Sequence, residues 1–229
     1  MRLARPAHPM AAATAAAVFL LAGCGGGGDG SKDDKIDGAG GSADKSASPS
    51  KSGAPAEGDT ADFRTSDIEL PDDIDMVFAW EKPADDNKAA ALDGAADYMR
   101  ALNHGTVEQD PKDPVLLRHT IPLQTAAEFA TAKIKADVKE GLTVTGKERI
   151  YNEEVGDMVK GNLIEVAFCV DQSDFFSKEI KTGKTRRTEA SDKDYTRLTL
   201  VMQKPKQKQR AWKARTFLFE GEAVEKCKG

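Results

Sequence analysis

Residues 163–170 read LIEVAFCV, and this stretch decides the fold class of the chain. Its large apolar side chains fall at every second position, the spacing that places them on one face of a β-strand. They are Ile164, Val166, Phe168 and Val170. The same alternation recurs in residues 142–151, 195–202 and 210–219, so this half of the chain is predicted to form successive antiparallel strands.

Helical patterns come before these strands. Residues 85–104 carry apolar side chains at helical spacing, and Gly105 is expected to end this helix. We interpret residues 78–83 (FAWEKP) as the lead into it. A shorter helical turn is expected at residues 114–119.

A further helix is predicted to begin at a capping box of Thr125 and Glu128 and to stop at Gly141. Its buried face is expected to hold Phe129, Ala132 and Ala136. Helices followed by a run of strands predict the α+β class. In this fold, N-terminal helices pack on one face of an antiparallel sheet of about four to five strands.

The N-terminus has the three parts of a secretory signal, in residues 1–23. Arg2 and Arg5 precede an apolar stretch of eleven residues, Ala11–Leu21, which is too short to span a membrane as a helix of about 20 residues. The last residue of this stretch opens the sequence Leu21-Ala22-Gly23-Cys24, which resembles the lipobox of bacterial lipoproteins. The resemblance implies acylation of Cys24 and a lipid anchor on the outer face of the cell membrane; the alternative is an ordinary signal peptide with an incidental cysteine.

A tether is expected between this anchor and the folded part. Residues 24–65 consist mainly of Gly, Ser, Ala, Asp, Lys and Pro, a composition too poor in apolar surface to offset the entropy of ordering. Such a coil would have an r.m.s. span of roughly 35 Å. Residues 66–229 then suit a single domain.

Two cysteines remain after the signal and Cys24 are set aside. In an exported protein the pair Cys169 and Cys227 is most simply a disulfide, the alternative being two buried thiols. The segment Cys169-Val170-Asp171-Gln172-Ser173, together with the order of the elements, resembles exported actinobacterial proteins of the nuclear-transport-factor-2-like superfamily. The resemblance implies a cone, in which a strongly curved sheet wraps around the helical layer, and it supports the same cysteine pairing. Its members include isomerases, dehydratases and hydrolases as well as domains without catalysis.

Candidate catalytic groups are few. An enzyme in such a cone needs a carboxylate or a histidine in an apolar pocket. The preferred candidates for an acid–base pair are His119, in the segment expected to line the cone, and Asp171. His104 is better explained as a residue at a helix end, and Glu165 as a residue that faces solvent. The sequence shows no nucleophile motif, phosphate-binding glycine loop or metal-ligand spacing, so no cofactor and no metal are expected.

Charge is distributed unevenly, with twelve basic residues against three acidic ones between Lys181 and Arg215. These loops either are simply solvated or contact anionic lipid or wall polymer; nucleic acid is not an expected partner, because aromatic residues do not alternate with the basic ones. The sequence thus predicts a non-catalytic binding or scaffold module. Its expected partners are the membrane through the lipid anchor, a cell-wall polymer, an envelope protein or a small apolar ligand. The alternative is an isomerase-, dehydratase- or hydrolase-like enzyme acting on a small apolar substrate.

Overall fold

The computed structural model describes residues 66–206 and 211–228. The predicted signal peptide, Cys24 and the tether of residues 24–65 lie outside these residues, so those three assignments stay predictions. None of the described helices is both long and apolar enough to cross a membrane.

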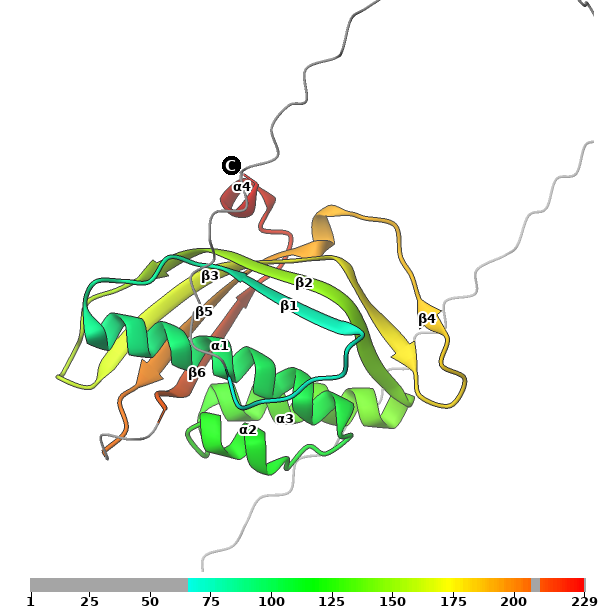
Figure 1. Ribbon diagram of the computed structural model, residues 1–229, viewed down its shortest axis with the longest axis horizontal. Coiled ribbons are helices and arrows are strands. Elements are labelled where there is room, and N and C mark those ends of the chain that lie inside the picture. Colours follow the sequence, from blue (N-terminus) through cyan, green and yellow to red (C-terminus); the bar gives the residue numbers. More distant parts are fainter. Residues whose placement is uncertain (1–65, 207–210, 229) are drawn as a thin grey trace, which may run out of the picture. The chain divides into compact units, whose positions relative to one another are not determined.

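The described residues form an α+β fold, as predicted (Figure 1). A curved sheet of six strands arches over one side of the helices α1 to α3, and the short helix α4 lies on its other, convex side. In chain order the elements are β1 (Ile74–Ala79), α1 (Asp86–Val107), α2 (Pro114–His119), α3 (Thr125–Glu140), β2 (Leu142–Val155), β3 (Leu163–Glu179), β4 (Thr185–Arg186), β5 (Tyr195–Gln203), β6 (Lys213–Glu220) and α4 (Val224–Cys227).

The sheet has the order β1-β2-β3-β5-β6, with β4 paired to β3. The four strands predicted from the alternating pattern are all present, and their neighbours pair antiparallel. Strand β1 was not predicted, and it pairs parallel to β2, with Ile74 opposite Gly146. Residues 78–83 therefore do not simply lead into a helix, because Phe78 and Ala79 belong to this strand.

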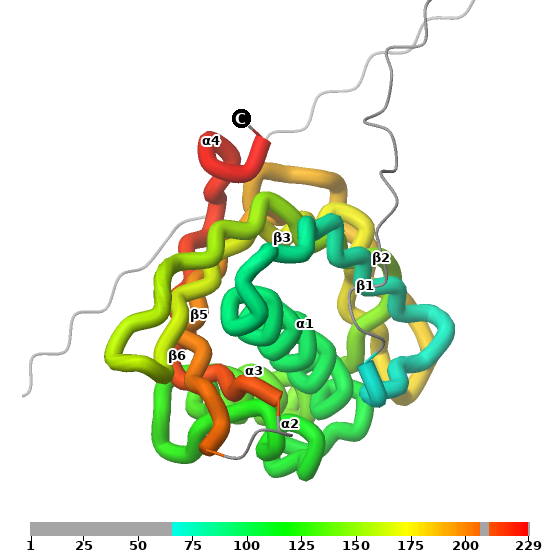
Figure 2. The backbone as a smooth tube through the Cα atoms, turned by 60° about the vertical axis from the view of Figure 1, so that its left-hand side comes forward, coloured from blue at the N-terminus to red at the C-terminus, as the bar shows by residue number. Residues whose placement is uncertain are grey.

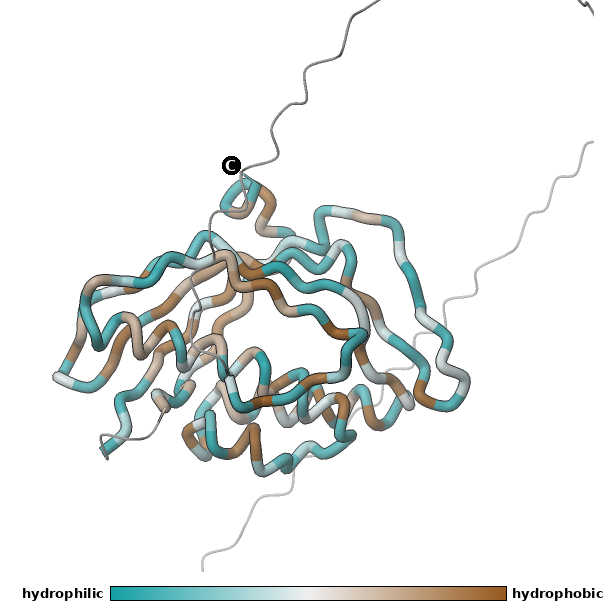
Figure 3. The backbone as a smooth tube through the Cα atoms, viewed as in Figure 1, coloured by the Kyte–Doolittle hydropathy of each residue, from teal (hydrophilic) through white to brown (hydrophobic). Residues whose placement is uncertain are grey.

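The main core lies between the concave face of the sheet and α1, which runs beneath the arch (Figure 2). The four alternating side chains of β3 are buried there, as are Leu198, Leu200 and Met202 of β5. Figure 3 shows apolar stretches on the central strands and helices, while the segment around β4 is mainly hydrophilic. The prediction for β6 holds only in part, since Phe217 is buried whereas Phe219 is 62% exposed.

Two local predictions about the ends of the helices are wrong. Gly105 does not end α1; it lies within the helix where an added Cβ would be 2.7 Å from Cδ1 of Ile134, so its small size permits close packing against α3. The capping box at Thr125 is absent, because the Thr125 hydroxyl instead accepts a hydrogen bond from the backbone N–H of Phe217. The helix that follows still stops at Gly141 in the left-handed conformation, as expected.

The buried face of α3 also differs from the prediction. The fully buried residues are Ala126, Ala130 and Ile134, whereas Ala132 and Ala136 are exposed. Phe129 is half-buried and stacks on Phe217 at 3.9 Å between ring centroids. The small side chains of this face let α3 approach α1 and β6 closely, which the apolar pattern alone did not reveal.

Candidate ligand pocket

A cavity of about 110 Å³ opens between the concave face of the sheet and the helices α1 and α3. Its walls are mainly apolar and come from both helices and from the strands β2, β3, β5 and β6. Among the wall residues are Met99, Leu102, Phe129, Val170, Leu198 and Phe217. Five polar or charged side chains accompany them in the lining: Asn103, Lys133, Glu148, Gln172 and Thr196. An apolar cavity with a few convergent polar groups is the usual form of a small-molecule site.

Glu148 is the only carboxylate that lines this cavity among the described residues, and it is 2% exposed. Its Oε1 accepts a hydrogen bond of 2.7 Å from Nε2 of Gln172, and its Oε2 accepts one of 3.3 Å from Nδ2 of Asn103. Burial raises the pKa of the Glu148 carboxyl above its ordinary value, while these hydrogen bonds and the charge of Lys133 act in the opposite direction.

The backbone explains why a charged residue points inward here. Along β2 the buried positions alternate, and Glu148 is in phase with Leu142, Val144 and Ile150 on the core side. The pairing with β3 shifts register between Lys147 and Arg149, where Glu148 lies opposite two residues of β3, Gln172 and Ser173. Bulges of this kind re-aim a side chain and are frequent beside functional sites. The same alternation in the sequence, with Leu142, Val144 and Ile150, assigns Glu148 to a core position and is the signal that marks it.

The cavity has an inner and an outer end. Glu148 and Thr196 are buried, whereas Phe219 at the mouth is 62% exposed. Lys133 also lines the cavity, and its Nζ lies 2.7 Å from Oδ2 of Asp137, one turn away on α3. A ligand would therefore pass an aromatic mouth before it reaches the carboxyl group.

The two catalytic candidates from the sequence do not meet. His119 ends α2, where its Nδ1 lies 3.8 Å from Oδ2 of Asp97, and it borders a separate surface hollow with Arg118 and Lys213. Asp171 follows the core-facing Val170 on β3, so it faces the convex side, where its Oδ1 accepts a hydrogen bond from the N–H of Ser173. The sheet thus separates the proposed acid–base pair.

The other two weak candidates have structural surroundings. His104 lies near the end of α1 with its Nδ1 2.6 Å from Oδ2 of Asp113, the residue that caps α2. Glu165 is exposed, in agreement with its interpretation as a solvent-facing residue. Within residues 66–206 and 211–228, no three His, Cys, Asp or Glu side chains are grouped so that they could hold a metal ion.

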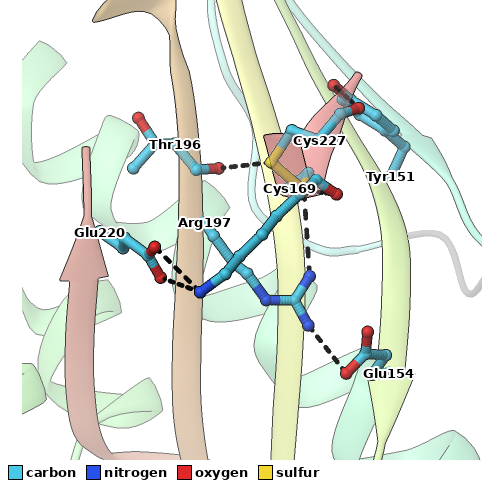
Figure 4. The surroundings of a disulfide bond; sticks show 8 residues. Tyr151, Glu154, Cys169, Thr196, Arg197, Glu220 and Cys227 are labelled. Atoms are coloured by element: carbon cyan, nitrogen blue, oxygen red, sulfur yellow. Dashed lines mark hydrogen bonds and ion pairs between the residues drawn. A yellow bond between two sulfur atoms is a disulfide. The ribbon is translucent and has the colours of Figure 1, made fainter. Parts of the chain in front are cut away.

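Cys169 and Cys227 form the expected disulfide, with their Cα atoms 5.6 Å apart (Figure 4). The bond joins β3 to α4 on the convex side of the sheet, in a small buried cluster with Tyr151 and Ala223. The hydroxyl of Tyr151 donates a hydrogen bond of 3.0 Å to the carbonyl oxygen of Cys227. The disulfide and the cavity therefore lie on opposite faces of the sheet.

Comparison with known proteins finds likeness only among solved structures. No protein-family model and no curated protein matches the chain. A ketosteroid isomerase-like protein from Erwinia carotovora atroseptica matches with a TM-score of 0.38 and 14% identity, over 60% of this chain and 97% of that one. A candidate ketosteroid isomerase from Shewanella frigidimarina matches with a TM-score of 0.31 and 17% identity, over 57% and 94%. Likenesses at these TM-scores carry no argument about activity.

Proposed function

We propose that this chain is a lipid-anchored protein on the outer face of the cell membrane, and that its cone-like domain binds a small, mainly apolar molecule without transforming it. The observation that carries the proposal is the cavity beneath the sheet, with apolar walls and Glu148 at its inner end. The binding of an apolar group there would remove its surface from water, at roughly 25 cal/mol per Å².

The proposed location rests on the sequence. The signal-like residues 1–23, Cys24 and the low-complexity segment that follows fit a tethered lipoprotein, for which stable anchoring takes more than one acyl chain. A disulfide between Cys169 and Cys227 is compatible with this location, because disulfides persist in oxidising compartments outside the cytoplasm.

The preference for binding over catalysis follows from the arrangement of polar groups. His119 and Asp171 are separated by the sheet, so neither can assist the other. Both carboxyl oxygens of Glu148 already accept hydrogen bonds from neutral amides, which orient the group. A carboxyl group that two hydrogen bonds hold in place is well suited to bind a ligand in one orientation.

A matched pair of substitutions on β5 tests the proposal. Thr196 faces the cavity, whereas Thr199 lies on the convex face of the same strand. We expect the domain of residues 66–229 to bind a neutral apolar dye such as Nile red, Thr196→Phe to abolish this binding, and Thr199→Phe to preserve it, with circular dichroism as the check on folding. Native mass spectrometry of the domain from its own envelope would then identify a retained ligand. Equal dye binding by both variants would contradict the proposal.

A second candidate function, proton-transfer catalysis, is favoured by one observation. Glu148 is a buried carboxyl in the cavity whose pKa is raised by burial, as expected of a general base. A small test substrate is cyclohex-3-enone, which becomes cyclohex-2-enone when a proton leaves the α carbon and another returns at the γ carbon. Under our proposal the protein gives no rate above buffer, measured by ultraviolet absorbance. A rate that is lost in Glu148→Gln but kept in His119→Ala would establish the enzyme instead.

A further inference from the structure

The geometry points to a specific ligand class: we infer that the cavity takes a small organic cation, an alkylammonium group held by the Glu148 carboxylate with its alkyl chain among the aromatic side chains at the mouth. This inference rests on the proposed binding function and adds the chemistry of the ligand to it. It is carried by three features of the cavity, namely its one carboxylate, its aromatic lining and its size.

Only one acidic side chain reaches the cavity among the described residues, and no carboxylate competes with it for a cation. The neighbouring donors, Gln172 and Asn103, are neutral, and each uses one N–H on Glu148. A carboxylate has about four acceptor positions, so two hydrogen bonds leave room for the N–H donors of an ammonium group. Hydrogen bonds between such charged groups are about twice as strong as neutral ones.

Lys133 is the cation that could already neutralise Glu148, and its position argues against that role. Its Nζ forms an ion pair of 2.7 Å with Asp137, on the same helix. The other elements packed around the carboxyl contribute no charge to it: α1 contributes Asn103, β3 contributes Gln172, and β1 contributes Met76, whose sulfur accepts from Asn103. The carboxyl is thus oriented by two neutral amides, and the nearby cation Lys133 is paired with Asp137.

The aromatic residues suit the alkyl chain of such a ligand. Four phenylalanines line the cavity: Phe129, Phe175, Phe217 and Phe219. Two of them, Phe129 and Phe217, are stacked and form one continuous wall. Their rings offer apolar surface to the alkyl chain, which would lie nearer the mouth than the ammonium group at Glu148.

The size of the cavity sets the size of the ligand. A cavity of about 150 Å³ holds benzene in an apolar core, and this one, at about 110 Å³, is smaller. It therefore encloses a head group and a short alkyl segment, and a larger molecule such as Nile red would lie partly outside the mouth. A longer chain would extend over Phe219, which is 62% exposed.

Three isosteric probes test the inference: hexylammonium, 1-hexanol and hexanoate, each measured by calorimetry and by displacement of Nile red. At neutral pH we expect hexylammonium to bind at least about tenfold more tightly than hexanol, as a charge-assisted hydrogen bond would give, and hexanoate not to bind. Glu148→Gln should remove this advantage and leave hexanol affinity unchanged. The control Glu165→Gln, which neutralises an exposed carboxylate on the other face of β3, should alter neither affinity.

A pH series adds a second measurement. Hexylammonium affinity should fall on acidification as Glu148 takes up a proton, since burial raises the pKa of this carboxyl, and hexanol affinity should stay constant. Equal binding of hexylammonium and hexanol, or loss of both in Glu148→Gln, would overturn the ligand class while leaving a binding pocket in place. Failure of Nile red and of every probe to bind would instead overturn the proposed function, and the inference with it.

Discussion

Glu148 combines two properties that rarely occur together, a charge and nearly complete burial. Burial raises its pKa in the folded protein above the ordinary 4.5, so the folded state holds the proton more tightly than the unfolded chain does. The carboxyl therefore contributes stability below pH 4.5, and this contribution is lost as the pH rises through the folded pKa.

Substitution of this residue should make the effect visible. In Glu148→Gln the titration is absent, so the melting temperature of the variant relative to the native protein should increase from acid to neutral pH. Melting curves followed by circular dichroism over this range would measure the difference. The exposed Glu165→Gln substitution serves as the reference, and a constant difference for Glu148→Gln would refute the assignment.

At the residue scale, the sequence predicts structural roles better than it predicts the site. The disulfide between Cys169 and Cys227 was expected from an even cysteine count, because pairing is the simple state of two cysteines in an exported protein. Glu148 was missed, although the strand alternation that predicted β2 also assigns it to the core face. His119 was grouped with Asp171 because its segment was expected to line the cone, and only the fold shows that the sheet lies between the two residues.

At the scale of elements, α1 depends on a glycine in its middle. A Cβ on Gly94 would lie 2.7 Å from the backbone oxygen of Trp212 and 2.8 Å from its Cβ. Alanine has the higher helix propensity by about 1 kcal/mol, but the clash with a backbone that cannot rotate away should cost about 1–3 kcal/mol. We therefore expect Gly94→Ala to destabilise the domain, as measured by urea unfolding.

The second glycine of the helix provides the comparison. At Gly105 an added Cβ would meet the Cδ1 atom of Ile134, the far end of a flexible side chain that can change its rotamer. Gly105→Ala should therefore lower the free energy of unfolding less than Gly94→Ala does. The opposite order would show that the contact with Trp212 does not limit the packing of α1.

The disulfide joins β3 and α4 across 58 positions of the chain. By the chain-entropy estimate, closing a loop of this length stabilises the folded state by about 4 kcal/mol. The double substitution Cys169→Ser with Cys227→Ser should lower the free energy of unfolding by up to this amount, and a reducing agent should then have no further effect. Dye binding should persist, because the cavity lies on the other face of the sheet.

Elements with a clear period were the ones that sequence could predict. Four strands and three helices were expected near their observed bounds, since alternation and helical spacing record which face is buried. Strand β1 was not predicted, because it is short and its partner strand lies far away in the sequence. The buried face of α3 was misplaced since small residues such as Ala126 and Ala130 give a weak apolar signal.

At the scale of the whole molecule, the two faces of the sheet have different structural roles. The concave face forms the core and the candidate pocket, and the convex face carries the disulfide and α4 (Figures 1 and 4). Substitutions on the convex face that keep the fold should therefore leave ligand binding intact. The proposed binding can therefore be tested independently of changes on the convex face.

The anchor itself makes a separate prediction. Cys24→Ser removes the thiol that would be acylated, so the full-length variant should leave the membrane fraction, in which the unsubstituted protein is expected to remain. Fractionation of expressing cells followed by immunoblotting would measure this, and the purified domain should bind Nile red as before. Equal membrane retention of both proteins would show that Cys24 is not the attachment point.

The parallel pairing of β1 with β2 has a consequence for the order in which the domain assembles. About 70 residues and three helices separate the paired positions, whereas β2, β3, β5 and β6 follow one another and pair with closer neighbours in the chain. Contacts between distant segments carry the larger loop-closure cost and form slowly. Strand β1 is therefore expected to join the sheet late and to open first, so its amide hydrogens should exchange with solvent before those of β3 and β5.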